Sequence, residues 1–327
     1  MTTRPRHAGN LRTWIVSDGK IGMENQCRGV AEALGVDAEI KRIDIAKPWR
    51  WLPPQLWLSP LSVLTEKGDR LAPPWPDLLI ATGRKSVAPA LAIRTASGGK
   101  TFCVQIQNPG VDPARFDLVI APQHDGLVGE NVVSLLGSPH GVTANKLAQA
   151  RSEFAALVEP LPQPRIAVLL GGDNAVYRMT DAIADALARQ LADAARSSGG
   201  GLAITASRRT PASAMVRIRA ALTGEATMFY DGKGPNPYLG YLAWADAVIV
   251  TADSVNMVTE ATATGKPVYV VALDGGSAKF ERFHRAMREA GYTRPFEGII
   301  ETWCYEPPAE TQRAAAEIAR RLHLATR

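Results

Sequence analysis

The sequence predicts an α/β protein made of two doubly wound, Rossmann-like domains that face a central cleft. Short runs rich in β-branched residues alternate with helical patterns, and this alternation starts anew at residue 165. Such alternation is typical of parallel sheets covered by helices. The 327 residues, 46% of them hydrophobic, can fill two cores rather than one. A stiff connector, with three prolines within residues 160–164, separates the two halves.

The first half begins with a strand and an amphipathic helix over about residues 22–34. Its residues Cys27, Val30, Ala31 and Leu34 recur at the spacing of one buried helical face. Further helices are expected up to about residue 94 and over about 143–158. The strands of this half are expected at residues 13–18, 38–43, 77–83, 101–107, 116–122 and 131–139.

The second half repeats the pattern, and the predicted domains are residues 1–160 and 161–305. The segment 306–327 is expected to form a final helix, and its return to the first domain is left open. Strands are expected at residues 165–174, 199–207, 226–232, 247–251 and 267–273. Helices are expected up to about residue 196, from about 211, and over 235–246, 254–264, 278–290 and 308–324.

Composition and charge exclude several classes of function. The net charge of +5 comes from 37 basic and 32 acidic residues without any block of like charge, so no nucleic-acid partner is predicted. The excess suits a phosphorylated small molecule or an anionic membrane surface. Three widely spaced cysteines indicate neither a disulfide framework nor a zinc site. No apolar run of signal-peptide or membrane-spanning length occurs, so we expect a cytoplasmic protein, with peripheral contact on the inner face of the membrane left open.

A proline- and tryptophan-rich passage, residues 47–60, interrupts the first half. Trp49, Trp51 and Trp57 lie close together within it. The passage either packs its rings on the domain or presents a surface to an acceptor or a membrane.

Small polar residues gather where the strand at 247–251 ends, within the stretch "TADSVN". Asp253 or Ser254 is expected to cap the following helix, whose first-turn amides can bind phosphate. Glu260, two turns later, can accept the hydroxyls of a ribose. A capped helix with an ordinary surface glutamate is the alternative.

Two other strand ends of the second half offer partners for a phosphate. Gly171 and Gly172, in "GGDN" with Asn174, permit a tight turn and a close approach of the backbone. Arg208 and Arg209 follow the strand at 199–207, where a guanidinium can pair with phosphate oxygens.

The first half supplies the candidates for proton transfer. His124 and Asp125 end the strand at 116–122 as the best acid and base pair in the sequence, although a local capping role for the histidine stays open. Asp18 follows the first strand and is a further catalytic candidate. No metal ligand set and no D-x-D motif is found, so neither a metal nor a cofactor is predicted.

The segment "TADSVNMVTEATATGKPVYVV" resembles the donor-site segment of the B-type, two-domain nucleotide-sugar enzymes. That resemblance implies a GT-B-like fold, a diphosphate held at Ser254, Val255 and Asn256, and a ribose held by Glu260, although no glycine follows the serine here. The stretch "ITASRRT" is similar to a segment of the UDP-N-acetylglucosamine 2-epimerases. Ser207 stands where those enzymes have histidine, which counts against epimerase chemistry.

Over the whole chain, the sequence resembles the mitochondrial fission (elongated mitochondria) protein family. The segments that carry this resemblance are "GMENQCRGVAEALG", "VQIQNP", "FDLVIAPQHD", "LLGGDN" and "TADSVNMVTEA". It implies a glycosyltransferase that takes a sugar from a nucleotide-sugar, expected to be UDP-linked, to an unknown acceptor such as a lipid-linked or cell-envelope saccharide. The alternatives are an epimerase on the same fold and a non-catalytic, membrane-associated adaptor.

Overall fold

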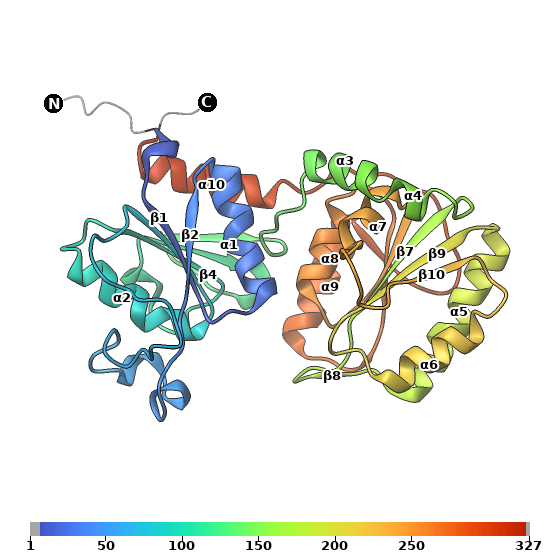
Figure 1. Ribbon diagram of the computed structural model, residues 1–327, viewed down its shortest axis with the longest axis horizontal. Helices are drawn as coiled ribbons and strands as arrows, with labels where there is room; N and C mark the ends of the chain where they lie inside the picture. The colour runs from blue at the N-terminus through green and yellow to red at the C-terminus, as the bar shows by residue number, and fades with distance from the viewer. Residues whose placement is uncertain (1–6, 325–327) are drawn as a thin grey trace. The chain divides into compact units, whose positions relative to one another are not determined.

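The computed structural model describes residues 7–324, which divide into two compact units (Figure 1). The first unit contains the described residues up to Gly141 together with those from Ala309 onward. The second unit runs from Val142 to Pro308. Each unit is built on a six-stranded, all-parallel sheet, so the predicted pair of doubly wound domains is confirmed.

The first unit has the strand order β2-β1-β3-β4-β5-β6. Its strands are β1 (Thr13–Ser17), β2 (Ala38–Arg42), β3 (Leu78–Thr82), β4 (Phe102–Ile106), β5 (Leu118–Pro122) and β6 (Val132–Leu135). Its α-helices are α1 (Ile21–Leu34), α2 (Val87–Ala96) and α10 (Glu310–Arg321). Short 3-10 turns occur at η1 (Ala8–Asn10), η2 (Trp49–Trp51), η3 (Pro54–Leu56), η4 (Arg84–Ser86), η5 (Pro113–Arg115) and η6 (Gln123–Asp125).

Both faces of this first sheet are buried, as expected for parallel strands between helical layers. Successive side chains of β1 alternate between faces, so that Trp14 and Val16 join the core beneath α2 while Ile15 joins the core beneath α1 and α10. Ile318 of α10 lies in that second core, and Figure 1 shows α10 alongside α1. The C-terminal helix therefore belongs to the first unit.

The second unit has the strand order β10-β9-β7-β11-β12-β14, and a two-stranded antiparallel pair, β8 and β13, lies outside this sheet. The strands are β7 (Arg165–Leu170), β8 (Tyr177–Arg178), β9 (Gly201–Ala206), β10 (Thr227–Phe229), β11 (Ala247–Thr251), β12 (Val268–Val271), β13 (Asp274–Gly275) and β14 (Thr293–Pro295). The helices are α3 (Ala144–Glu153), α4 (Ala155–Val158), α5 (Asp181–Ser198), α6 (Ala212–Ala221), α7 (Tyr238–Trp244), α8 (Val255–Thr262) and α9 (Ala278–Glu289).

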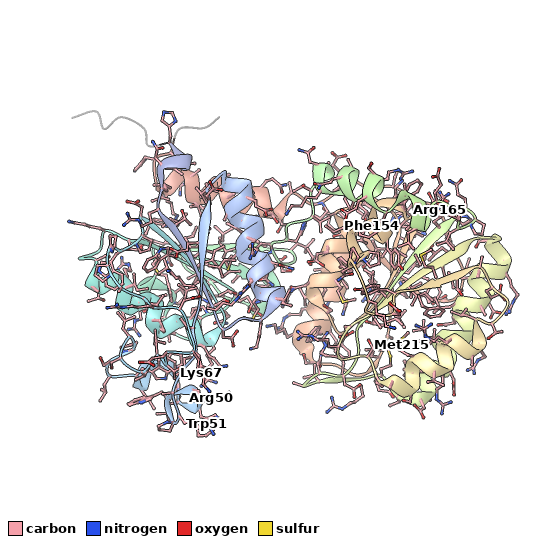
Figure 2. The ribbon with its side chains drawn as sticks, viewed as in Figure 1. Arg50, Trp51, Lys67, Phe154, Arg165 and Met215 are labelled. Atoms are coloured by element: carbon pink, nitrogen blue, oxygen red, sulfur yellow. The ribbon has the colours of Figure 1, made fainter. Side chains whose placement is uncertain are left out.

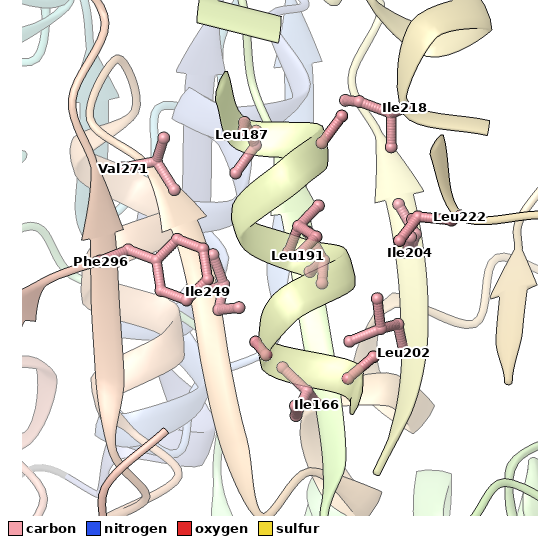
Figure 3. Close-up of a cluster of buried hydrophobic side chains, with 14 of the residues drawn as sticks. Ile166, Leu187, Leu191, Leu202, Ile204, Ile218, Leu222, Ile249, Val271 and Phe296 are labelled. Carbon is pink, nitrogen blue, oxygen red and sulfur yellow. The ribbon is translucent and has the colours of Figure 1, made fainter. Parts of the chain in front are cut away.

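The core of the second unit lies where α5 crosses the strands. Leu187 and Leu191 of α5 point into a fully buried cluster with Ile204 and Ile249 (Figure 3). Along each strand, residues of this cluster alternate with buried residues of the opposite face of the sheet. This alternation fixes the register of β7, β9 and β11 and holds their carboxyl ends at one edge.

The boundary between the units lies at Gly141–Val142, before residues 143–158 rather than after them. Helices α3 and α4 pack on α7 of the second unit. The ring of Phe154 lies against Gly240, where any added Cβ would be 2.6 Å from it, and the Trp244 indole donates to the Arg151 carbonyl at 2.8 Å. The proline-rich connector expected to divide the domains at residue 160 is therefore internal to the second unit. The second boundary falls at Pro308–Ala309 instead of residue 305.

Candidate functional site

The strand order reverses once in each sheet, between β1 and β3 in the first unit and between β7 and β11 in the second. Loops leave opposite faces of a sheet at such a point, which makes a natural place for a ligand beyond the carboxyl ends of the strands. The predicted site residues of both units fall mainly in these loops.

The side chain of Asp253 is the centre of the second unit's switch point. It is buried, and it accepts hydrogen bonds from the Thr251 hydroxyl at 2.7 Å and from the Arg209 guanidinium at 2.5 Å. The Thr251 hydroxyl in turn accepts the backbone N–H of Gly171 at 2.7 Å. One carboxylate thus ties together the ends of β7, β9 and β11.

Gly171 and Gly172 are required by the close approach of the loops that follow β11 and β9. A Cβ on Gly171 would lie 1.9 Å from an Asp253 carboxylate oxygen, and one on Gly172 would lie 2.2 Å from the Arg209 carbonyl. Asn174 joins the same cluster, because its side-chain amide donates to the Asp253 carbonyl at 3.2 Å. The "GGDN" turn is therefore shaped to fit the loop that follows β11.

Ser254 caps helix α8 by accepting the Met257 amide at 3.3 Å, so the cap predicted at Asp253 or Ser254 is the serine. Val255 and Asn256 are the first two residues of this helix and are partly exposed. First-turn amides lack intrahelical acceptors, and the helix dipole adds positive potential there. The start of α8 is therefore suited to an anion.

The two adjacent arginines after β9 have different surroundings. Arg209 pairs with Asp253, whereas the exposed Arg208 guanidinium makes no ion pair or hydrogen bond within residues 7–324. Ser207 is engaged in the turn itself, since its hydroxyl accepts the Arg209 amide at 3.1 Å. Arg209 is thus committed to the site's structure, and Arg208 is available to a ligand.

Glu260 lies on α8 and is held by a tyrosine from the neighbouring helix. One carboxylate oxygen accepts the Tyr238 hydroxyl at 2.6 Å. Burial raises the pKa of Glu260 to about 7, against the lowering effect of the tyrosine hydrogen bond. A cavity of about 480 Å³ opens beside Tyr238 between α3 and the start of α7.

At the first unit's switch point, Asp18 follows β1 and meets a lysine that follows β3. One of its carboxylate oxygens lies 3.3 Å from the Lys85 ammonium and 3.3 Å from that of Lys20. Its other oxygen is buried and has no hydrogen-bond partner in the described part of the chain. Asp18 can therefore accept one further hydrogen bond.

His124 and Asp125 form the turn η6 directly after β5, with both side chains buried. The imidazole Nε2 lies 3.9 Å from an Asp125 carboxylate oxygen. The two residues thus face each other closely enough for the carboxylate to stabilise a protonated imidazole. Of the described residues, no group of three or more His, Cys, Asp and Glu side chains is arranged to hold a metal ion.

Sequence reasoning missed the pairing role of Asp253 and the partners Tyr238 and Lys85. Asp253 was considered only as a cap, although an aspartate directly after a buried strand is itself a signal. Lys85 could have been found by applying the strand-end rule to the loop after β3.

The fold is shared with solved nucleotide-sugar enzymes. The chain matches the UDP-GlcNAc 2-epimerase of Neisseria meningitidis, solved with UDP-GlcNAc bound, at a TM-score of 0.51 and 13% identity over 95% of this chain and 98% of that one. It matches the UDP-GlcNAc 2-epimerase of Methanocaldococcus jannaschii at a TM-score of 0.53 and 10% identity over 94% and 99%. This class of protein is the GT-B type, with two Rossmann-like domains in one chain.

Within that class, the chain belongs to the family "Mitochondrial fission ELM1", which matches residues 21–322. The mitochondrial fission protein ELM1 of Arabidopsis thaliana is 35% identical over 76% of this chain, which spans 64% of the plant protein's length. The uncharacterized protein RP120 of Rickettsia prowazekii (strain Madrid E) is 26% identical over 93% of this chain and 97% of its own length. No helix within residues 7–324 is long and apolar enough to cross a bilayer.

The pairing of Asp253 with Arg209 predicts that two neighbouring arginines contribute unequally to stability. Arg209→Ala leaves a buried carboxylate without its cation and should lower the free energy of unfolding by about 2–3 kcal/mol. Arg208→Ala, one residue away and exposed, should change it by less than about 0.5 kcal/mol. Chemical denaturation followed by circular dichroism measures both.

A rescue variant separates charge from packing in that comparison. Asp253→Asn in the Arg209→Ala background removes the unpaired charge and should recover a large part of the loss. Equal losses for the two arginine variants, or no recovery, would contradict the assigned pairing.

The raised pKa of Glu260 predicts a stability that depends on pH. The folded pKa of about 7 exceeds the ordinary value of 4.5, so between these values the folded protein binds more protons than the unfolded chain. Stability should therefore fall as pH rises from about 4.5 through 7, by on the order of 2–3 kcal/mol. Glu260→Gln should lose this component, and Glu289→Gln, an exposed glutamate on α9, should keep it. Identical pH profiles of unfolding for all three proteins would refute the assignment.

Proposed function

We propose that the second unit binds a nucleoside-diphosphate sugar, UDP-linked, and that the protein transfers the sugar to a saccharide hydroxyl. The carrying observation is the assembly of three strand ends around Asp253. It brings the start of α8, the "GGDN" turn and Arg208 to one edge of the sheet.

The diphosphate is the ligand group that this edge supports best. The Val255 amide at the start of α8 has no acceptor within its own helix, and Arg208 offers a guanidinium that can pair bidentately with phosphate oxygens. Since Asp253 is neutralised by Arg209, its negative charge does not repel an anion placed there. Glu260 is available to a ribose through the carboxylate oxygen that Tyr238 does not occupy.

In the proposed transfer, an acceptor oxygen forms the new bond to the sugar's anomeric carbon. The bond from that carbon to the diphosphate oxygen breaks, and the diphosphate leaves with the electron pair. Amides of α8 and Arg208 stabilise its negative charge. The acceptor hydroxyl gives its proton to a general base, and His124, Asp125 and Asp18 of the first unit stay the predicted candidates for that role.

An epimerase is the second candidate because the two solved structures compared above are epimerases. Epimerisation requires acid and base groups at the sugar carbon. Ser207 holds the turn after β9 and cannot supply one there, so transfer is preferred.

A thermal-shift comparison of UDP, UDP-GlcNAc, GDP, ADP and CMP tests the binding step. A ligand at about 100 times its dissociation constant should stabilise the second unit by roughly 2.7 kcal/mol. We expect UDP and UDP-GlcNAc to raise the melting temperature of the wild type and of Glu289→Gln. Glu260→Gln should lose most of this shift because the remaining amide oxygen is taken by Tyr238 and the NH2 group that replaces the other oxygen donates instead of accepting. Absence of a shift with every nucleotide would overturn the proposal.

The products of turnover then separate the two candidate activities. A transferase releases free UDP from UDP-GlcNAc only when a saccharide acceptor is added. An epimerase converts the nucleotide-sugar to an isomer without acceptor and releases no stoichiometric UDP. Binding without either product would leave the non-catalytic adaptor.

A further inference from the structure

The connection between β2 and β3 projects from the first unit and exposes large apolar side chains. It forms no strand of the six-stranded sheet and carries the turns η2 and η3. Trp51, Leu56 and Leu58 are 64%, 56% and 93% exposed. These three belong to a set of eight exposed large apolar side chains in the described residues, yet they fall within eight consecutive positions. We call residues 49–58 the apolar tip.

The tip is held in place by its own buried residues. Trp57 is buried in the core beneath α2, and its indole N–H donates to the Leu52 carbonyl at 3.3 Å. The Gln55 side-chain amide donates to the Gly110 carbonyl at 3.0 Å. Because the Trp57 side chain is buried, its sequence neighbours Leu56 and Leu58 remain exposed to solvent.

The charged side chains within the tip's own stretch of chain are basic. Residues 45–64 contain Lys47 and Arg50 and no acidic residue, while Asp44, directly before this stretch, lies within electrostatic reach of Arg50. The Lys47 ammonium lies 5.6 Å from the centroid of the Trp51 ring, a cation–π contact. Figure 2 shows Arg50 and Trp51 in the same projecting part of the first unit, with Lys67 nearby. An indole flanked by basic groups is the composition that settles at the boundary between lipid headgroups and acyl chains.

We propose that the apolar tip docks the protein on the surface of a bilayer that contains anionic lipids. Trp51 and Leu58 enter the headgroup and upper acyl region, and Lys47 and Arg50 contact lipid phosphates. A bilayer fits better than a protein partner because the tip is a narrow projection of a few side chains. Stable protein interfaces use some twenty or more residues on each side. This inference is independent of nucleotide binding by the second unit.

Sedimentation with large unilamellar vesicles tests the docking. One set contains phosphatidylcholine alone, and the other contains about one third phosphatidylglycerol. The full chain should bind the anionic vesicles more tightly and lose affinity as salt is raised. Trp51→Ser with Leu58→Ser should lower the partition coefficient about tenfold or more. Lys47→Gln with Arg50→Gln should remove the preference for phosphatidylglycerol.

Matched controls keep the result interpretable. Val216→Ser with Ile299→Ser replaces two exposed apolar side chains of the second unit and should leave vesicle binding unchanged. All variants change exposed side chains, and circular dichroism verifies that each is folded. Lipids brominated on the acyl chain should quench wild-type fluorescence more than that of Trp51→Phe.

Two outcomes would overturn the docking. The first is failure of the wild type to sediment with anionic vesicles at low salt, which would leave the tip to a protein partner. The second is an equal loss of binding in the control pair and the tip pair.

Discussion

Burial of the Asp253 carboxylate is the constraint on which the second unit's site depends. A charge removed from water must be paired and hydrogen-bonded, and here the partners come from two different strand ends. Arg209 arrives from β9 and Thr251 from β11, while β7 must bring a glycine because any side chain at position 171 would overlap the carboxylate. Satisfying one side chain therefore fixes three loops at once. It also leaves the guanidinium of Arg208 exposed at the same edge, where the dipole of α8 favours an anion.

The first unit also pairs an aspartate with a basic side chain from another strand end. Asp18 leaves β1 and meets Lys85 after β3, again at the point where the strand order reverses. Here the other carboxylate oxygen of Asp18 is buried and has no hydrogen-bond partner among the described residues.

The sequence was informative wherever a signal is local. Continuous β-branched runs such as Val248–Ile249–Val250 predicted buried strands, and Gly171, Arg209 and Ser254 do lie in loops that follow strands, as the sequence indicated. Strand β14 (Thr293–Pro295) was missed because three residues that include a proline carry no apolar alternation. The unit boundary was misplaced because the prolines at 160–164 punctuate the chain, whereas the contact of Phe154 with Gly240 depends on tertiary packing. The Tyr238–Glu260 and Arg209–Asp253 pairs could not be predicted from the sequence, because each pair joins residues from separate elements and depends on tertiary packing.

Amide hydrogen exchange with and without UDP tests the central claim most directly, namely that the strand ends assembled by Asp253 hold a nucleoside diphosphate. The account predicts that added UDP slows exchange in residues 171–174 and 254–257, because their backbone groups contact or flank the diphosphate, while β10 is unchanged. Protection confined to other segments, or no protection at a UDP concentration that saturates the thermal shift, would contradict it.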